Sequence, residues 1–236
     1  MKTRPPKALV KASRSEKERL EKQQLKEIQS KLNVPLVTYG PYDWDSRCRQ
    51  ATEAEWMNDI AASLRSKYAE ANELWPETAQ RRRKALDVAY PPGFRDDCKA
   101  LQAGNAAGLE TAIRFLEADP WFFGTGYKKA DLIKWITRLD LSARDATRLQ
   151  GVVLHAVDSR DRREFRSYCR LARKVDTPEL RDALAERLID DSEDVRRRAR
   201  WVLDALGAFE KGPDDLRNKA WRFLTEREES RGNHGS

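Results

Sequence analysis

The sequence predicts an all-α fold. Apolar residues recur at helical spacing along most of the chain, and no alternating strand pattern competes with them. Pro and Gly stand between these periodic segments, where they act as helix boundaries. Of the 236 residues, 39 % are hydrophobic, and these include seven Trp, seven Phe and six Tyr, which is enough for a folded core. We therefore expect short helices joined by turns.

Residues 1–48 are expected to form a basic extension that contains one helix. Residues 1–38 contain ten basic and four acidic residues, a net charge of +6 (10 − 4), against +7 (46 − 39) for the whole chain. Residues 1–12 have the composition of a disordered basic arm, and residues 13–32, which lack Gly and Pro, predict a mainly solvated helix. Over residues 33–48 prolines and a glycine break the helical pattern, and aromatic side chains are expected to pin a loop.

Residues 49–104 are expected to be a helical region. Apolar positions recur at three and four residues over residues 53–75, and Pro76 is expected to end this helix. A second helix is predicted over residues 76–90, where a Pro-Pro-Gly sequence stops it. Its four consecutive cations at 81–84 wrap around the helix, so they cannot form one face. We interpret them as solvated residues answered by nearby glutamates.

Residues 105–230 are predicted to form a series of helices, each with one apolar face, followed by a disordered tail at 231–236. Ser142 is expected to cap one helix, Thr177 with the following Pro begins another, and Gly207 ends a third as a left-handed cap. The last predicted helix caps the series. The predicted helices cover residues 108–117, 127–139, 142–157, 162–175, 177–188, 191–207 and 214–227.

A repeated turn indicates how these helices are arranged. The Asp-Ser pairs that begin at Asp158 and Asp191 are 33 residues apart (191 − 158), which is the period of a helix pair. Residues 179–207 carry a D…VR…A pattern formed by Asp191, Val195, Arg196 and Ala199. This segment resembles a HEAT or HEAT-like repeat, and residues 105–207 resemble the family more loosely in helix order and length. The resemblance implies a short solenoid of helical hairpins, an architecture used for binding.

Basic residues on these helices are the candidate binding site for nucleic acid or another anionic partner. The resemblance implies that the second helix of each hairpin lines the concave side. The spacing of Arg162, Arg166, Arg170 and Arg173 places them on one helix face. The candidates are Lys134, Arg138, Arg162, Arg166, Arg170, Arg173, Arg196 and Arg200. Arginine suits phosphate contacts, but acidic residues nearby in the sequence can equally neutralise these charges as surface pairs.

An aromatic segment is the candidate partner-binding loop. It contains Trp121, Phe122, Phe123 and Tyr127. The alternative is that these aromatics plug the core between repeats. Because glycines precede a helix with two lysines in its first turn, an anion on the free backbone N–H groups is a further possibility there.

Composition excludes several classes of enzyme and of membrane protein. The chain has only two histidines and three widely spaced cysteines, and it lacks phosphate-loop, nucleophile-elbow and dinucleotide-binding motifs. We therefore expect no catalytic residue, metal, cofactor or small-molecule substrate, and we expect inert thiols and a core position for His155. No apolar run is long enough for a membrane helix and no secretion signal is evident, which predicts a cytoplasmic protein without a membrane partner.

Taken together, these features predict a non-catalytic binding protein. The first hypothesis is an adaptor or regulatory subunit of a larger complex, which uses a helical-repeat surface to bind a protein partner. The alternative is a protein that binds DNA or RNA by contacting phosphates through its arginine stripes. A minor alternative follows from the resemblance, because HEAT-like DNA glycosylases combine a basic concave surface with carboxylates and aromatics. The sequence shows no matching catalytic set.

Overall fold

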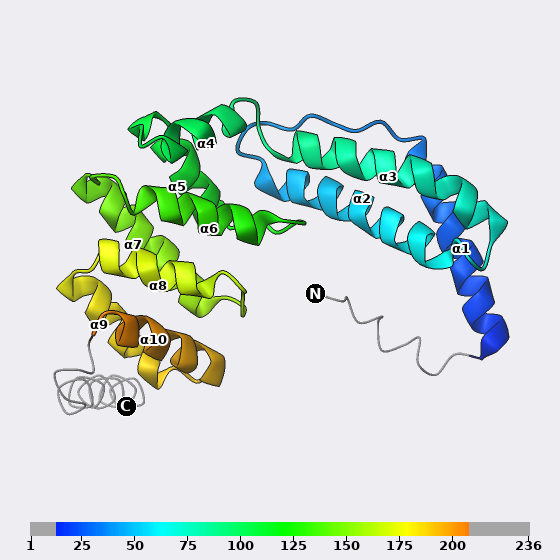
Figure 1. Ribbon diagram of the computed structural model, residues 1–236. Helices are drawn as coiled ribbons and strands as arrows, with labels where there is room; N and C mark the ends of the chain where they lie inside the picture. The colour runs from blue at the N-terminus through cyan, green and yellow to red at the C-terminus, as the bar shows by residue number, and fades with distance from the viewer. Residues whose placement is uncertain (1–12, 208–236) are drawn as a thin grey trace, which may run out of the picture. The chain divides into compact units, whose positions relative to one another are not determined.

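The computed structural model describes residues 13–207, and the regular elements in that range are all helices, as the sequence predicts (Figure 1). The chain divides into two compact units, Met1–Pro92 and Gly93–Ser236. This division falls inside the region 49–104, whose predicted limits were at 48/49 and 104/105. The predicted basic arm, the last helix and the tail lie outside the described residues. Among the described helices, none has the length and apolarity needed to cross a bilayer.

From residue 13 onward the first unit contains three helices, α1 (Arg14–Leu32), α2 (Trp44–Leu64) and α3 (Ala69–Ala89). The hairpin of α2 and α3 is visible in Figure 1, and α1 packs against both helices. The core includes Ile28, Met57 and Ala85. The helix predicted over residues 13–32 is therefore present, and it buries only a narrow stripe of its surface.

The sequence-based prediction of one helix over residues 53–75 is wrong. The chain turns between Leu64 and Ala69, and α3 then runs through Pro76. The turn lets α3 fold back along α2, and Leu64 and Ala71 pack together with Leu25 of α1. Proline inside a helix removes one backbone hydrogen bond, and the packing of the hairpin outweighs that loss.

The loop predicted over residues 33–48 ends earlier, because Asp43 caps α2 and Trp44 already lies in the helix. The Asp43 side chain accepts a hydrogen bond from the backbone N–H of Ser46 at 3.1 Å. The loop is held by Arg47, which is buried and donates to the carbonyl oxygens of Tyr39, Gly40 and Val88. Burial lowers the pKa of Arg47. The contacts that hold this loop therefore come from a buried guanidinium, whereas Tyr42, one of its aromatics, is exposed.

The described part of the second unit, residues 93–207, is a stack of seven α-helices. They are α4 (Phe94–Gln102), α5 (Leu109–Ala118), α6 (Thr125–Ile136), α7 (Ala143–Asp158), α8 (Phe165–Lys174), α9 (Pro178–Glu186) and α10 (Glu193–Ala205). Short 3-10 turns, Ala106–Gly108 and Arg187–Ile189, precede α5 and follow α9. Figure 1 shows the stack running from α4 at one end to α10 at the other.

The seven helices form two rows. In one row α4, α6, α8 and α10 each contact the next, and in the other α5, α7 and α9 do the same. Helices of the two rows also contact each other, and they bury side chains such as Leu116, Ile133, Val153, Tyr168 and Leu203. The core of this unit is therefore continuous along the stack.

The predicted helix ends of this unit are confirmed where the signal is local. Ser142 accepts a hydrogen bond from the N–H of Asp145 at 3.1 Å, and Thr177 accepts one from Leu180 at 3.3 Å. Gly207 has a φ of 66° and ends α10 in the left-handed conformation. The helix predicted over residues 162–175 begins three residues late, at Phe165.

Candidate anion-binding site

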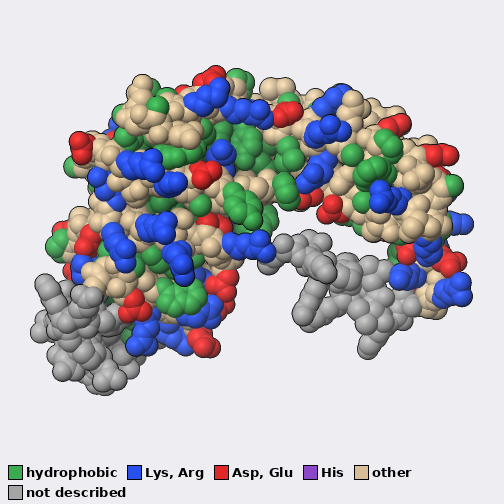
Figure 2. All heavy atoms as spheres, viewed as in Figure 1, with side chains coloured by type: hydrophobic (Ala, Val, Ile, Leu, Met, Phe, Trp, Pro, Cys, Tyr) green, Lys and Arg blue, Asp and Glu red, His purple; other side chains and the backbone are tan. Residues whose placement is uncertain are grey.

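Four of the predicted cations are exposed and unpaired. Lys134, Arg138, Arg166 and Arg170 form no ion pair with any acid of residues 13–207. Lys134 lies on α6 and Arg138 follows it, whereas Arg166 and Arg170 lie on α8, which packs against α6. We call these four residues the basic face. Figure 2 shows one side of this unit, where Lys and Arg side chains are spread over α7 and α8.

The other four predicted cations interact within the chain. Arg173 donates to the carbonyl oxygen of Ala205 at 2.6 Å, and Arg196 donates to two carbonyl oxygens of the turn before α10. Arg200 is exposed and also has a partner in the chain. Arg162 lies before α8 and points inward. The predicted stripe from Arg162 to Arg173 is therefore not a single exposed stripe, because its first member is buried and its last is bound to α10.

Arg162 belongs to a buried ion cluster built on Asp119. Asp119 ends α5 in the left-handed conformation, with a φ of 45°. Its carboxylate accepts hydrogen bonds from Lys129 at 2.5 Å and from both terminal nitrogens of Arg162 at 2.9 and 3.2 Å. The three side chains are 7 %, 0 % and 1 % exposed respectively. A left-handed aspartate is strained, and the two cations hold it in place.

The cluster keeps Asp119 ionised. Burial raises the pKa of this carboxyl, but hydrogen bonds and positive charge from Lys129 and Arg162 outweigh burial and hold the pKa below its ordinary value. Arg162 also donates to the hydroxyl groups of Tyr168 and Ser159. Most polar groups of the cluster are thus hydrogen-bonded, which a buried charge network requires.

Two further basic side chains approach Asp119 from the solvent side. Nε2 of His155 and a terminal nitrogen of Arg160 each lie 3.7 Å from Oδ2 of Asp119. Their side chains are 56 % and 45 % exposed. The prediction that His155 belongs to the core is wrong, because α7 buries Val153 and Val157 but turns the position between them outward. We call Asp119, Lys129, His155, Arg160 and Arg162 the Asp119 cluster.

The loop between α7 and α8, which carries Arg160, is fixed from α9 and α10. Arg198 of α10 is buried and donates to the carbonyl oxygens of Val157 and Ser159, and to the carboxylate of Asp161. After α9, Arg187 forms a two-point ion pair with Asp158 at 2.6 and 2.7 Å. These contacts place Arg160 on a rigid support.

The aromatic segment divides between the two predicted roles. Phe122 is buried and acts as a core plug, whereas Trp121, Phe123 and Tyr127 are exposed. The guanidinium of Arg160 lies 3.8 Å from the centre of the Trp121 ring, so this segment borders the Asp119 cluster. The anion predicted at the start of α6 finds an acid of the chain nearby, because a Cβ added at Gly126 would lie 2.7 Å from the carboxylate of Glu164.

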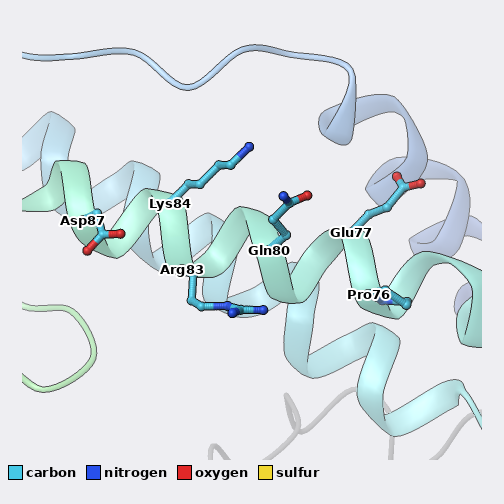
Figure 3. A pocket seen from close by; sticks show the side chains of 6 residues that line it. All are labelled: Pro76, Glu77, Gln80, Arg83, Lys84 and Asp87. Carbon is cyan, nitrogen blue, oxygen red and sulfur yellow. The ribbon is translucent and has the colours of Figure 1, made fainter.

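A hollow of about 470 Å³ along α3 is less suited to a ligand (Figure 3). All six lining residues come from this one helix, and two acids balance the two cations among them. Figure 3 shows Arg83 and Lys84 extending in different directions. Of the neighbouring cations, Arg81 donates to the carbonyl of Val34 and Arg82 pairs with Glu55, so the basic run wraps around the helix as expected.

Sequence reasoning missed Asp119, Lys129, Arg160 and Arg198. The sequence nevertheless contains a signal for two of them, the cations Lys129 and Arg198. Lys129 precedes Leu132, Ile133 and Ile136 at helical spacing, and Arg198 stands in the same way among the apolar positions of α10. A cation on a buried face needs an acid partner. Nothing in the sequence identifies Asp119 as the partner of Lys129.

The described residues contain no group of three His, Cys, Asp or Glu side chains that could hold a metal ion. Burial raises the pKa of the Cys98 thiol to about 11 and also raises that of Cys169. Comparison of the chain with known protein families, curated proteins and solved structures finds no match.

Proposed function

We propose that this chain is a non-catalytic binding protein whose second unit contacts the phosphates of a nucleic acid. The observation that carries this proposal is the basic face. Its four cations are exposed on neighbouring helices and have no acidic partner in the described part of the chain. Three are arginines, whose planar guanidinium groups match phosphate oxygens.

The two rows of helices support the proposal of a short HEAT-like solenoid. Each helix contacts the next one of its own row, as stacked hairpins do, and Val195 and Ala199 of the D…VR…A pattern are buried in α10. In such a stack α6, α8 and α10 present their outer side chains together. A location in the cytoplasm, with no membrane partner, is part of the same proposal.

A protein partner is the second candidate, and the exposed aromatics favour it. Trp121, Phe123 and Tyr127 lie at the surface beside charged residues. Exposed aromatic side chains surrounded by polar ones are typical of protein interfaces. In this case the chain is an adaptor or regulatory subunit of a larger complex.

The HEAT-like DNA glycosylase alternative has one observation in its favour, the ionised Asp119 beside an exposed Trp. Against it, both carboxylate oxygens already accept hydrogen bonds from Lys129 and Arg162. We therefore expect no release of bases from alkylated or otherwise damaged duplex DNA. If the wild type does release bases, and a folded Asp119→Asn variant does not, the chain is a glycosylase and the non-catalytic proposal is wrong.

The test is a fluorescence anisotropy titration of labelled nucleic acid over a range of salt concentrations. Each phosphate contact contributes about 0.7–0.9 to the slope of log affinity against log salt, so the Arg166→Ala/Arg170→Ala variant should lower the magnitude of the slope by about 1.4–1.8. Arg144→Ala removes an exposed arginine of α7 outside the basic face and serves as the matched control. An unchanged slope contradicts the proposal. In a separate pull-down with the chain as bait, one stoichiometric protein that stays bound at high salt after nuclease treatment supports the adaptor.

A further inference from the structure

We infer that the exposed side of the Asp119 cluster, together with Trp121, is a binding site for one unpaired nucleotide. The phosphate lies on Arg160 and His155, and the base stacks on the exposed aromatic segment. This inference rests on the proposed function, because it names the form of nucleic acid that the second unit holds. It makes single-stranded nucleic acid the preferred partner.

The charges of the cluster leave Arg160 and His155 available for a ligand. Inside the cluster, the two buried cations Lys129 and Arg162 both contact the carboxylate of Asp119 and neutralise it. Arg160 is therefore in excess. It lies farther from Asp119 than the hydrogen-bonded cations do, and it remains 45 % exposed. A phosphate here gains a charge-assisted contact without breaking the buried network.

The aromatic part of the site selects a base that is not already stacked. The guanidinium of Arg160 lies over one face of the Trp121 ring, and Trp121 is still 48 % exposed. Tyr127 is exposed on the same segment. Nucleobases stack on aromatic rings and on guanidinium planes, and each base offers a suitable face. In a duplex these faces are covered by neighbouring base pairs, so the arrangement of one phosphate contact beside one ring fits a single strand.

The side chains of the site are held by contacts within the chain before any ligand binds. Arg198 and Arg187 hold the loop on both sides of Arg160, and Asp119 is fixed by its own two cations. A pre-ordered site loses little conformational entropy on binding. Asp119 acts here as a positioning residue, since its carboxylate is 7 % exposed and cannot itself reach a ligand phosphate without repulsion.

The experiment compares a short labelled oligothymidylate with a duplex of the same length. We expect wild-type protein to prefer the single strand, and Trp121→Ala to weaken its binding about 5- to 150-fold, the range for loss of one stacked base. Trp121→Phe should restore part of this loss. Arg160→Ala should weaken binding about tenfold, the effect of losing one hydrogen bond to a charged group. Arg144→Ala again serves as the control, and thermal melting verifies that each variant is folded.

The outcomes separate this inference from the proposed function. If Trp121→Ala and Arg160→Ala bind the single strand as the wild type does, while the Arg166→Ala/Arg170→Ala variant is weakened, the inference falls and the function stands. Equal affinity of the wild type for single strand and duplex also overturns the inference. If the wild type binds neither, both proposals fall. If a protein that co-purifies with the wild type no longer binds the Trp121→Ala variant, while nucleic-acid binding is unchanged, the aromatic segment binds a protein partner instead.

Discussion

At the scale of single residues, a side chain's partners decide its role more than its type does. Arg166 and Arg162 are four positions apart in the sequence, yet Arg166 is exposed, whereas Arg162 is buried in an ion pair with Asp119 and its side chain is 1 % exposed. The sequence predicted both as surface cations. Spacing alone cannot distinguish them, because the acid that draws Arg162 inward comes from a different helix hairpin.

Asp119 should be essential for the stability of the second unit. Asp119→Asn leaves Lys129 and Arg162 buried without a negative partner, which should cost about 3–5 kcal/mol in the free energy of unfolding. Urea unfolding measures this loss. Asp131→Asn, an exposed position on α6, is the control and should change stability by less than about 0.5 kcal/mol. A loss as small as the control's for Asp119→Asn would show that the buried network is not ionised.

At the scale of elements, local signals were readable and tertiary ones were not. The caps at Ser142 and Thr177 and the end of α10 at Gly207 depend on neighbouring residues, so the sequence was sufficient to predict them. The turn before α3 depends on what α1 covers, and the outward position of His155 depends on which side of α7 meets its neighbours. Periodicity gives a helix its apolar face but not where a hairpin bends.

The contact between α5 and α7 should make stability depend on pH. Arg148 of α7 bridges Glu110 and Glu117 of α5 at 2.6–2.8 Å, and hydrogen bonds from Arg148 and Arg114 lower the pKa of Glu110 from 4.5 to about 2. A lowered pKa stabilises the fold above the ordinary value of 4.5, and this contribution is lost as pH falls toward 2. Because Glu110 is half exposed, the effect should be about 0.5–1 kcal/mol.

Urea unfolding at a series of pH values checks this dependence. Glu110→Gln should flatten the fall in stability on the acid side, whereas Glu73→Gln, an exposed residue of α3, should follow the wild type. Parallel curves for Glu110→Gln and the wild type would show that the bridge between α5 and α7 contributes nothing in solution.

At the scale of the whole molecule, the sequence predicted the class of fold and the basic helices but not the division of the chain. The two compact units meet at Pro92 and Gly93, within a region that periodicity treats as one. Each unit has its own core and a buried arginine that holds a loop, Arg47 in the first unit and Arg198 in the second. Both arginines hold a loop by its carbonyl oxygens, a role that appears only once distant segments are brought together.

Damage to one unit should therefore be measurable by itself. Arg47→Met leaves three carbonyl oxygens of the first unit without their donor, at about 1–3 kcal/mol for each that stays buried. Hydrogen exchange should speed up in α2 and α3, whereas α6 and α8 and the affinity for nucleic acid should not change. Faster exchange in α8 would contradict the assignment of binding to the second unit alone.

The contacts that Arg198 makes with the α7–α8 loop fix the position of residue 160 independently of its side chain. Arg198 donates to the main-chain oxygen atoms of Val157 and Ser159 and to the carboxylate of Asp161, so the chain is held before and after position 160 without any contact to the side chain at 160. The side chain at position 160 can therefore change without loss of the loop conformation. In related chains, a single substitution at position 160 is enough to change which ligand binds there, because the contacts that hold the loop stay the same.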